Sequence, residues 1–334
     1  MLAPSHPENP TANPLVTMIV LCYNQARFVV ETLESVKAQT YKHTELIIVD
    51  DCSTDESVAV IGRWLQENQI ECTFIRHEKN QGVCKSLNEA LANTVGKYIS
   101  MTASDDVWLP DKIAQQVEIM ESQPDTVGVV YSDAFQMDEC GLPIAGMYIP
   151  ANNPKLPEIP PRQVLDALLD HNFIPGMTTL VRRSCYNVVG SYDESMPTED
   201  WDMWLRIAQH YSFLYSSIPV AKYRSHPDSF SHSDPVSMIV GTIMALAKQF
   251  ELGHLNEEQK STVAHTLALL HFELAIFARR NDNRVATMKQ LAACVQFGRF
   301  ALPGGFVAWT SLLGYGLFGL RRLRWWKGFN PQSG

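Results

Sequence analysis

The chain has 334 residues, of which 46% are hydrophobic and 19% are charged, and its formal net charge is −9 at pH 7. This composition suits a globular protein with a sizeable core and excludes the disordered and fibrous classes. The acidic balance also argues against a nucleic-acid-binding protein, which needs a basic surface, so we expect no nucleic-acid partner.

Short apolar runs alternate with helical patterns over the first third of the chain. The predicted strands are 17–21, 45–50, 72–76, 97–102 and 127–131, and the predicted helices are 26–37, 57–68, 83–93 and 112–121. Strands separated by helices in this way predict βαβ units. The expected fold class is therefore α/β, with a Rossmann-like, mostly parallel central sheet flanked by helices.

A proline-rich segment divides the rest of this domain. Residues 150–161 hold five prolines and predict neither a helix nor a central strand. We interpret the segment as a linker or active-site loop between a donor half, 15–133, and an acceptor half, 162–233, of one catalytic domain. The loops at 134–160 and 172–198 are expected to decide substrate specificity.

Two regions flank the expected catalytic domain, 15–233. Residues 1–14 lack the basic start and apolar core of a signal peptide and are expected to form a disordered lead-in. The pattern over 234–300 is helical, with predicted helices at 235–253, 257–280 and 283–299. Tetratricopeptide-type hairpins are an alternative, but no repeat period supports them, so we favour a plain α-helical extension.

The C-terminal segment, 301–334, is apolar and then basic. Residues 301–320 carry no charge, and 321–327 combine arginine, lysine and tryptophan. The length permits a transmembrane helix, whereas the glycines lower helix propensity, and the basic aromatic stretch suits a headgroup interface. We favour in-plane or re-entrant membrane association over burial against the catalytic domain or a true membrane span.

The cysteines give a further indication of the compartment. There are seven, they are scattered, and none forms a C-x-x-C pair. A disulfide framework and a zinc site are therefore not expected, and a reducing cytoplasm is. Together with the C-terminal segment, this predicts a cytoplasmic protein, peripheral on the inner face of the cytoplasmic membrane.

Acidic pairs follow two predicted strands. Asp50 and Asp51 follow the second, and Asp105 and Asp106 follow the fourth. An N-capped turn explains residues 53–55, but it does not explain adjacent carboxylates that repel each other. Ligands of parallel α/β sheets bind beyond the carboxyl ends of the strands, and a cation bound to a diphosphate needs only one or two protein carboxylates.

Two further motifs lie in the acceptor half. Glu199 and Asp200 precede an amphipathic pattern, where they either stabilise a helix start or supply a general base for a hydroxyl group. Arg224 and His226 lie among serines in the predicted loop 223–232. They are structural residues or a site for phosphate or metal.

The ordered set of motifs resembles the family 2 glycosyltransferases, which have a GT-A fold. The similarity runs from Val16 to about Ser231. Its motifs are the segments 16–24, 31–40, 48–55, 80–82, 96–99, 104–111 and 199–200, in the order of the family. Each motif is common by itself, whereas the ordered set is specific.

The resemblance implies an inverting hexosyltransferase that uses Mn²⁺ or Mg²⁺. It would move a sugar from a nucleotide-diphosphate sugar, UDP-linked by resemblance, to a hydroxyl of a saccharide or lipid-linked acceptor in polysaccharide or glycolipid synthesis. Tyr23 would stack near the base, Asp51 would bind the base or ribose, and Asp200 would be the base, with Glu199 beside it. Asp105 and His226 would hold the cation.

Other positions follow from the same resemblance. The residues implied on the donor side are Tyr23, Asn24, Asp51, Gly82, Lys85, Ser104, Asp105 and Asp106. The residues implied on the acceptor side are Trp108, Gly176, Met177 and Thr178.

One position departs from the family pattern. The first acid of the D-x-D signature is Ala103 here, which leaves Asp105 to bind the metal, with Ser104 or Asp106 as possible compensation. Ala103 is the main argument for the alternative that the chain is a catalytically inactive scaffold. The retained carboxylates of Asp51, Asp105 and Asp200 argue against that alternative. A nucleotidyltransferase is the other alternative, but it normally has a glycine-rich phosphate loop, and residues 21–25 contain no glycine.

Overall fold

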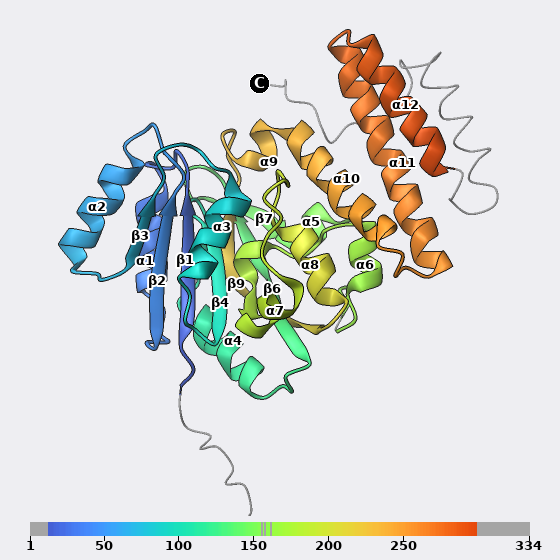
Figure 1. The fold of residues 1–334 in the computed structure, drawn as a ribbon. Helices are drawn as coiled ribbons and strands as arrows, with labels where there is room; N and C mark the ends of the chain where they lie inside the picture. Colours follow the sequence, from blue (N-terminus) through green and yellow to red (C-terminus); the bar gives the residue numbers. More distant parts are fainter. Residues whose placement is uncertain (1–12, 155, 157, 161, 299–334) are drawn as a thin grey trace, which may run out of the picture. The chain divides into compact units, whose positions relative to one another are not determined.

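The computed structural model describes residues 13–298 except 155, 157 and 161 (Figure 1). The chain divides into two compact units, one ending at Ala245 and the other beginning at Leu246. The first unit contains the sheet and the second is helical.

A single nine-stranded sheet organises the first unit, with the order β3-β2-β1-β4-β8-β6-β9-β5 and β7 paired to β6. The strands are β1 (Val16–Cys22), β2 (Thr44–Asp50), β3 (Thr73–Arg76), β4 (Tyr98–Ala103), β5 (Val107–Trp108), β6 (Val127–Met137), β7 (Pro143–Met147), β8 (Leu180–Arg182) and β9 (Ser212–Arg224). The donor half, β3-β2-β1-β4, is parallel as predicted. Antiparallel β8 then joins β4 to β6, so the sheet as a whole is mixed.

The helices confirm the predicted alternation in the donor half. They are α1 (Val29–Lys37), α2 (Ser57–Asn68), α3 (Val83–Ala92), α4 (Lys112–Glu121), α5 (Tyr148–Asn152), α6 (Leu165–Asp170), η1 (Gly176–Thr178), α7 (Arg183–Val189), α8 (Asp200–Ala208), α9 (Phe230–Ser233), α10 (Pro235–Glu251), α11 (Glu257–Arg280) and α12 (Arg284–Gly298). Strand β1 is buried at nearly every position, because helices pack against both faces of the parallel half (Figure 1).

The acceptor half contains strands that the apolar pattern did not reveal. β9 runs parallel to β6, but its ladder passes from Ser216 to Ala221 while β6 advances only from Ser132 to Ala134. Pro219 lies within this irregularity, which is where a proline is tolerated in a sheet. A proline inside an apolar run, as at Pro219, argues against a strand when only the sequence is considered. The sequence therefore did not predict β9.

The proline-rich segment is partly helical, which corrects the expectation for its first residues. Residues 150–152 belong to α5. Pro150 occupies the first turn of that helix, where a missing backbone N–H removes no intrahelical hydrogen bond. Neither a helix nor a strand covers the described residues between 153 and 160.

The second unit contains the helical hairpin of α11 and α12. Ala268 and Cys294 are fully buried between these helices, with Phe272 and Phe297 against them. Among the described residues α11 is the one helix long and apolar enough to cross a membrane, a test that core helices of soluble proteins also pass. The segment 301–334 and residues 1–12 lie outside the described residues, so the expectations for them are not addressed.

Candidate active site

The β1–α1 loop is locked onto the β2–α2 turn by side-chain hydrogen bonds. Asn24 has a left-handed φ of 55°. Its backbone N–H donates to Ser53 Oγ at 2.8 Å, and its Oδ1 accepts from the N–H of Thr54 at 2.7 Å. Asn24 therefore shapes the loop with its side chain, and it leaves the neighbouring Tyr23 ring 47% exposed for a stacking partner.

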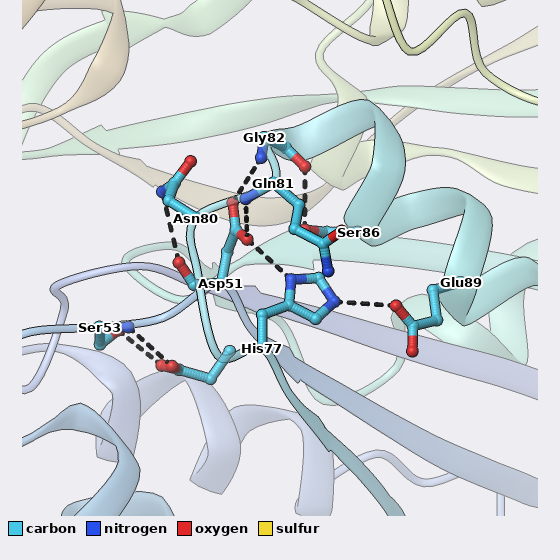
Figure 2. Close-up of polar contacts among 9 residues, drawn as sticks. Asp51, Ser53, His77, Asn80, Gln81, Gly82, Ser86 and Glu89 are labelled. Atoms are coloured by element: carbon cyan, nitrogen blue, oxygen red, sulfur yellow. Dashed lines mark hydrogen bonds and ion pairs between the residues drawn. The ribbon is translucent and has the colours of Figure 1, made fainter.

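The two acids after β2 have different tasks. Asp50 is buried and accepts hydrogen bonds from the N–H and the hydroxyl of Ser53, at 2.8 and 2.6 Å. It caps the turn and is closed to a ligand. Asp51 accepts from the backbone N–H groups of Gln81 and Gly82, at 2.7 and 2.8 Å (Figure 2). Asp51 therefore ties the end of β2 to the start of α3.

The start of α3 is built around Gly82. This residue is the N-cap of α3, with φ 85° and ψ 160°, a conformation that only glycine adopts without strain. Its N–H group is already bonded to Asp51, so the helix start holds a carboxylate of the protein itself. Lys85 is exposed on the first turn of α3.

The segment after β4 presents one carboxylate to the surface. Ala103 is exposed at the strand end, whereas Ser104 is 1% and Asp106 is 6% exposed. The Asp105 side chain retains 13% exposure. The expected donor contacts of Ser104 and Asp106, and their expected compensation for Ala103, do not fit this burial.

Asp106 is instead a structural anchor for the end of β9. Its Oδ1 accepts from the backbone N–H of Arg224 at 2.9 Å, and its carbonyl accepts from the Thr32 hydroxyl at 2.7 Å. Burial and the adjacent Asp105 charge raise the pKa of Asp106 well above its ordinary value. Arg224 also donates through Nε to the Asp105 carbonyl at 2.8 Å, which fixes the backbone that carries Asp105.

Asp105 and His226 lie together, as the sequence predicted for a metal site. Asp105 Oδ2 is 3.0 Å from His226 Nε2, and the His226 ring lies 4.7 Å from the Phe28 ring. His226 Nδ1 is buried without a hydrogen-bond partner among the described residues. Those residues contain no cluster of three or more His, Cys, Asp or Glu suited to a metal. The Asp105 side chain, 13% exposed, can meet a cation that arrives with a diphosphate, and the His226 side chain, 1% exposed, would reach that cation only beside Asp105. Phosphate and water complete the coordination of such a cation.

The carboxylate pair at the start of α8 is in a low-polarity setting. Glu199 is the N-cap of α8 and Asp200 its first residue. Burial and the Asp200 charge raise the pKa of Glu199 to about 8, and burial raises that of Asp200. Asp200 therefore ionises first and Glu199 remains protonated at neutral pH.

Asn172 is a residue that the sequence analysis missed. Its Nδ2 donates to Asp200 Oδ2 at 3.0 Å, while Asp200 Oδ1 accepts from the N–H of Trp201 at 2.7 Å. These contacts orient the carboxylate and favour its charged form. Asn172 lies in the loop after α6, and no local pattern marks it.

The expected acceptor residues are mostly interior. Trp108 is 2% exposed, and its indole N–H donates to the Met177 carbonyl at 3.0 Å. Met177 is 7% exposed and Thr178 is fully buried, where its Oγ1 donates to the Pro175 carbonyl. Direct acceptor contacts of these side chains do not fit their burial. Gly176 is partly exposed with open space beside it, so it is the member of this set that can line a substrate.

Tyr148, at the start of α5, was also missed. Its ring packs edge-on against Tyr223 at 4.7 Å. Burial, Tyr223 and the charges of Asp200, Asp106 and Asp133 raise its pKa. Tyr148 therefore lies within electrostatic reach of both the Asp200 side and the Asp106 side of the site. It belongs to the loop 134–160, which could not be placed from sequence.

Comparisons with known proteins identify the family and the fold. Residues 17–188 match Glycosyl transferase family 2. An uncharacterized glycosyltransferase of Rickettsia prowazekii (strain Madrid E) is 26% identical over 317 residues, which cover 93% of this chain and 92% of the relative. Three other rickettsial relatives are longer, and the matched part spans 31% to 35% of their length.

Two further similarities carry substrate names. UDP-Glc:alpha-D-GlcNAc-diphosphoundecaprenol beta-1,3-glucosyltransferase WfaP of Escherichia coli is 29% identical over 65% of this chain and 80% of its own length. The solved mannosyltransferase PcManGT from Pyrobaculum calidifontis, in complex with GDP-Man and Mn²⁺, superposes with a TM-score of 0.60 at 21% identity, over 92% of this chain and 81% of that one. The chain belongs to glycosyltransferase family 2, and it is a glycosyltransferase with the GT-A fold.

Proposed function

We propose that this protein is an inverting glycosyltransferase that moves a sugar from a nucleotide-diphosphate sugar to a hydroxyl group in polysaccharide or glycolipid synthesis. The observation that carries the proposal is the pair at the start of α8. The Asp200 carboxylate is held by Asn172 and by the backbone N–H of Trp201, and burial and the Asp200 charge raise the pKa of the adjacent Glu199. An oriented, partly desolvated carboxylate of this kind suits a general base.

The donor side offers a selective contact for the base. A carboxylate has about four lone-pair positions, and Asp51 uses three of them within the protein. The remaining position suits one N–H donor, which uracil and guanine both present next to a carbonyl. We propose a UDP-linked donor, stacked on Tyr23, because the relative WfaP is named for UDP-Glc.

A divalent cation, Mn²⁺ or Mg²⁺, would be held by Asp105 and His226 together with the diphosphate. When bound, it would neutralise negative charge on the departing nucleoside diphosphate. The bound Mn²⁺ in the similar mannosyltransferase structure supports this choice of cation. Ala103 adds no ligand, so the diphosphate itself is expected to supply much of the binding.

The reaction is a single displacement. The acceptor oxygen attacks the anomeric carbon of the donor sugar. The bond between this carbon and the diphosphate oxygen breaks, and the proton of the acceptor hydroxyl passes to Asp200. Because attack and departure occur on opposite faces, the anomeric configuration inverts. Glu199, protonated, adds no second negative charge beside the base.

The acceptor is proposed to be a saccharide or a lipid-linked saccharide. WfaP is named for a diphosphoundecaprenol-linked acceptor, and the basic, aromatic residues of 321–327 suit an anionic membrane surface. We therefore propose a cytoplasmic enzyme that is peripheral on the inner face of the cytoplasmic membrane.

A panel of nucleotide sugars tests the proposal. The protein is incubated with each donor, Mn²⁺ and lipid-linked saccharide acceptors, and the product is analysed by NMR. Transfer with inversion is expected for one donor. Pyrophosphate release from a nucleoside triphosphate and a sugar phosphate would instead indicate a nucleotidyltransferase, and absence of any turnover or donor binding would indicate an inactive scaffold.

A further inference from the structure

A histidine outside the residues assigned so far joins two carboxylates beside the donor side of the site (Figure 2). His77 Nδ1 lies 2.7 Å from Asp51 Oδ1, and Nε2 lies 2.9 Å from Glu89 Oε2. The His77 side chain is 3% exposed. Both ring nitrogens of His77 are therefore engaged by carboxylates, which fixes the orientation of the ring.

The histidine is held on three sides. Its backbone N–H donates to the Asp50 carbonyl at 3.0 Å, which fixes it to the end of β2. Its ring then spans from Asp51 to Glu89 on α3. Asp51 thus has one oxygen shared by His77 and the Gln81 N–H, and the other bonded to the Gly82 N–H. Rotation of the Asp51 carboxylate would break all three contacts.

The polar character of this cluster calls for a reason beyond packing. Desolvating a histidine ring and a carboxylate costs free energy, and apolar side chains of similar size often join two elements with equal or greater stability. Polar networks that are fully hydrogen-bonded, by contrast, hold a group in one orientation. Here the oriented group is Asp51, which keeps one acceptor position that the cluster does not use.

We propose that His77 and Glu89 are positioning residues for the donor nucleotide. His77 fixes the Asp51 carboxylate so that it meets an N–H group of the base, and Glu89 holds the His77 ring in the orientation that contacts Asp51. The inference rests on the proposed function, because it needs a nucleotide at this site. Neither residue touches the reacting atoms.

The test compares three single substitutions in the full chain. His77→Gln removes the imidazole ring, and Glu89→Gln keeps an acceptor but removes the carboxylate. His43→Gln is the matched control, since His43 is exposed before the opposite end of β2 and its ring contacts the Asn13 carbonyl. Binding of UDP and of GDP with Mn²⁺ is measured by calorimetry, donor KM and kcat by initial rates, and folding by thermal melting.

The expected result separates binding from chemistry. His77→Gln should raise the Kd and the donor KM about tenfold, the equivalent of one strong hydrogen bond to a charged group, with kcat within about twofold of the parent. Glu89→Gln should raise both about threefold, and His43→Gln should change neither. If His77→Gln does not fold, Glu89→Gln carries the test, because Glu89 is 44% exposed.

Two results would overturn the inference. One is nucleotide affinity in His77→Gln and Glu89→Gln equal to that of His43→Gln. The other is a parallel loss of kcat, affinity and melting temperature, which indicates a merely structural role. A parent protein that binds neither nucleotide contradicts the proposed function as well, whereas normal parent binding with unaffected variants contradicts the His77 role alone.

Discussion

Asp200 and Glu199 are neighbours in sequence but differ in what each can do. The Asp200 carboxylate accepts hydrogen bonds from Asn172 and from the backbone of Trp201. Burial and the Asp200 charge raise the pKa of Glu199 to about 8. The proposed function therefore assigns the base to Asp200 and a neutral side chain at pH 7 to Glu199, a difference that follows from environment and not from residue type.

The first prediction concerns the base. Asp200→Asn removes the proton acceptor with little change in shape, so kcat should fall about 10²- to 10⁴-fold, the usual contribution of general base catalysis. The Kd of the donor should remain within about twofold of the parent value, because the proposed base acts in the chemical step and not in donor binding. Asp125→Asn, at a side chain that is 95% exposed, serves as control. Transfer at the parent rate in Asp200→Asn would disprove the assignment.

The second prediction concerns pH. Burial raises the pKa of Asp200, so this carboxylate becomes protonated at a higher pH than an ordinary aspartate. Once protonated it can no longer accept a proton, so kcat/KM should decrease as the pH falls. As pH rises through about 8, Glu199 ionises and places a second negative charge beside the base and the anionic donor, so kcat/KM should decrease again. A bell-shaped profile is therefore expected.

Glu199→Gln checks this assignment. Its amide cannot ionise, so the alkaline limb should disappear while the acid limb remains. Initial rates measured from about pH 5 to 9.5 give both limbs. Persistence of the alkaline limb in Glu199→Gln would assign that limb to another group.

At the scale of elements, the loops at the ends of β1, β2 and β4 determine which side chains of the candidate site are exposed. The β1–α1 loop contains no glycine and is shaped by side-chain hydrogen bonds, four of which involve Asn24. The start of α3 does depend on glycine, because Gly82 has a positive φ and bonds to Asp51. The donor side is thus held by capping interactions between neighbouring loops.

The third prediction uses this difference. Gly82→Ala forces a side chain into a conformation that costs about 1–3 kcal/mol, so the melting temperature should fall and the donor KM should rise. Gly62→Ala is the matched control: Gly62 lies inside α2 with open space around its Cα, and alanine there should stabilise the helix by about 0.5–1 kcal/mol. Equal effects of the two substitutions on donor KM would contradict the proposed role of the α3 start.

At the scale of the whole molecule, the C-terminal part of the second unit, which begins at Leu246, contrasts in charge with the rest of the chain. Residues 283–334 contain seven Lys or Arg and no Asp or Glu, whereas the whole chain has a net charge of −9. Attraction to anionic lipid is worth about 1 kcal/mol for each basic residue near the surface and weakens with salt. This asymmetry is the basis for the proposed membrane location.

The fourth prediction follows from it. The full chain should float with liposomes that contain anionic lipid and should be released by about 0.5 M salt, because screening shortens the reach of surface charge. A 1–300 chain should remain in the soluble fraction, and neutral liposomes are the control. Equal flotation of both chains would remove the case for a membrane role of 301–334.

Much of the donor half was predictable because its determinants are local. Apolar runs and helical periods predicted β1 to β4 and α1 to α4, since a strand buried on both faces leaves a continuous apolar pattern. The strand-end acids were recognisable for the same reason. Asn172 and Tyr148 were not, because they lie in irregular loops and reach the site through contacts that no spacing in the sequence reveals.

The sequence by itself therefore determined the fold class, the family and the identity of the base candidate, all of which rest on short-range pattern and motif order. Only the tertiary structure decided which acids are buried and which remain exposed. It turned Asp106 inward to Arg224, buried Trp108, and left Asp105 beside His226. Burial and hydrogen bonding between distant segments set exposure and protonation, and neither is encoded at the single position where the residue stands.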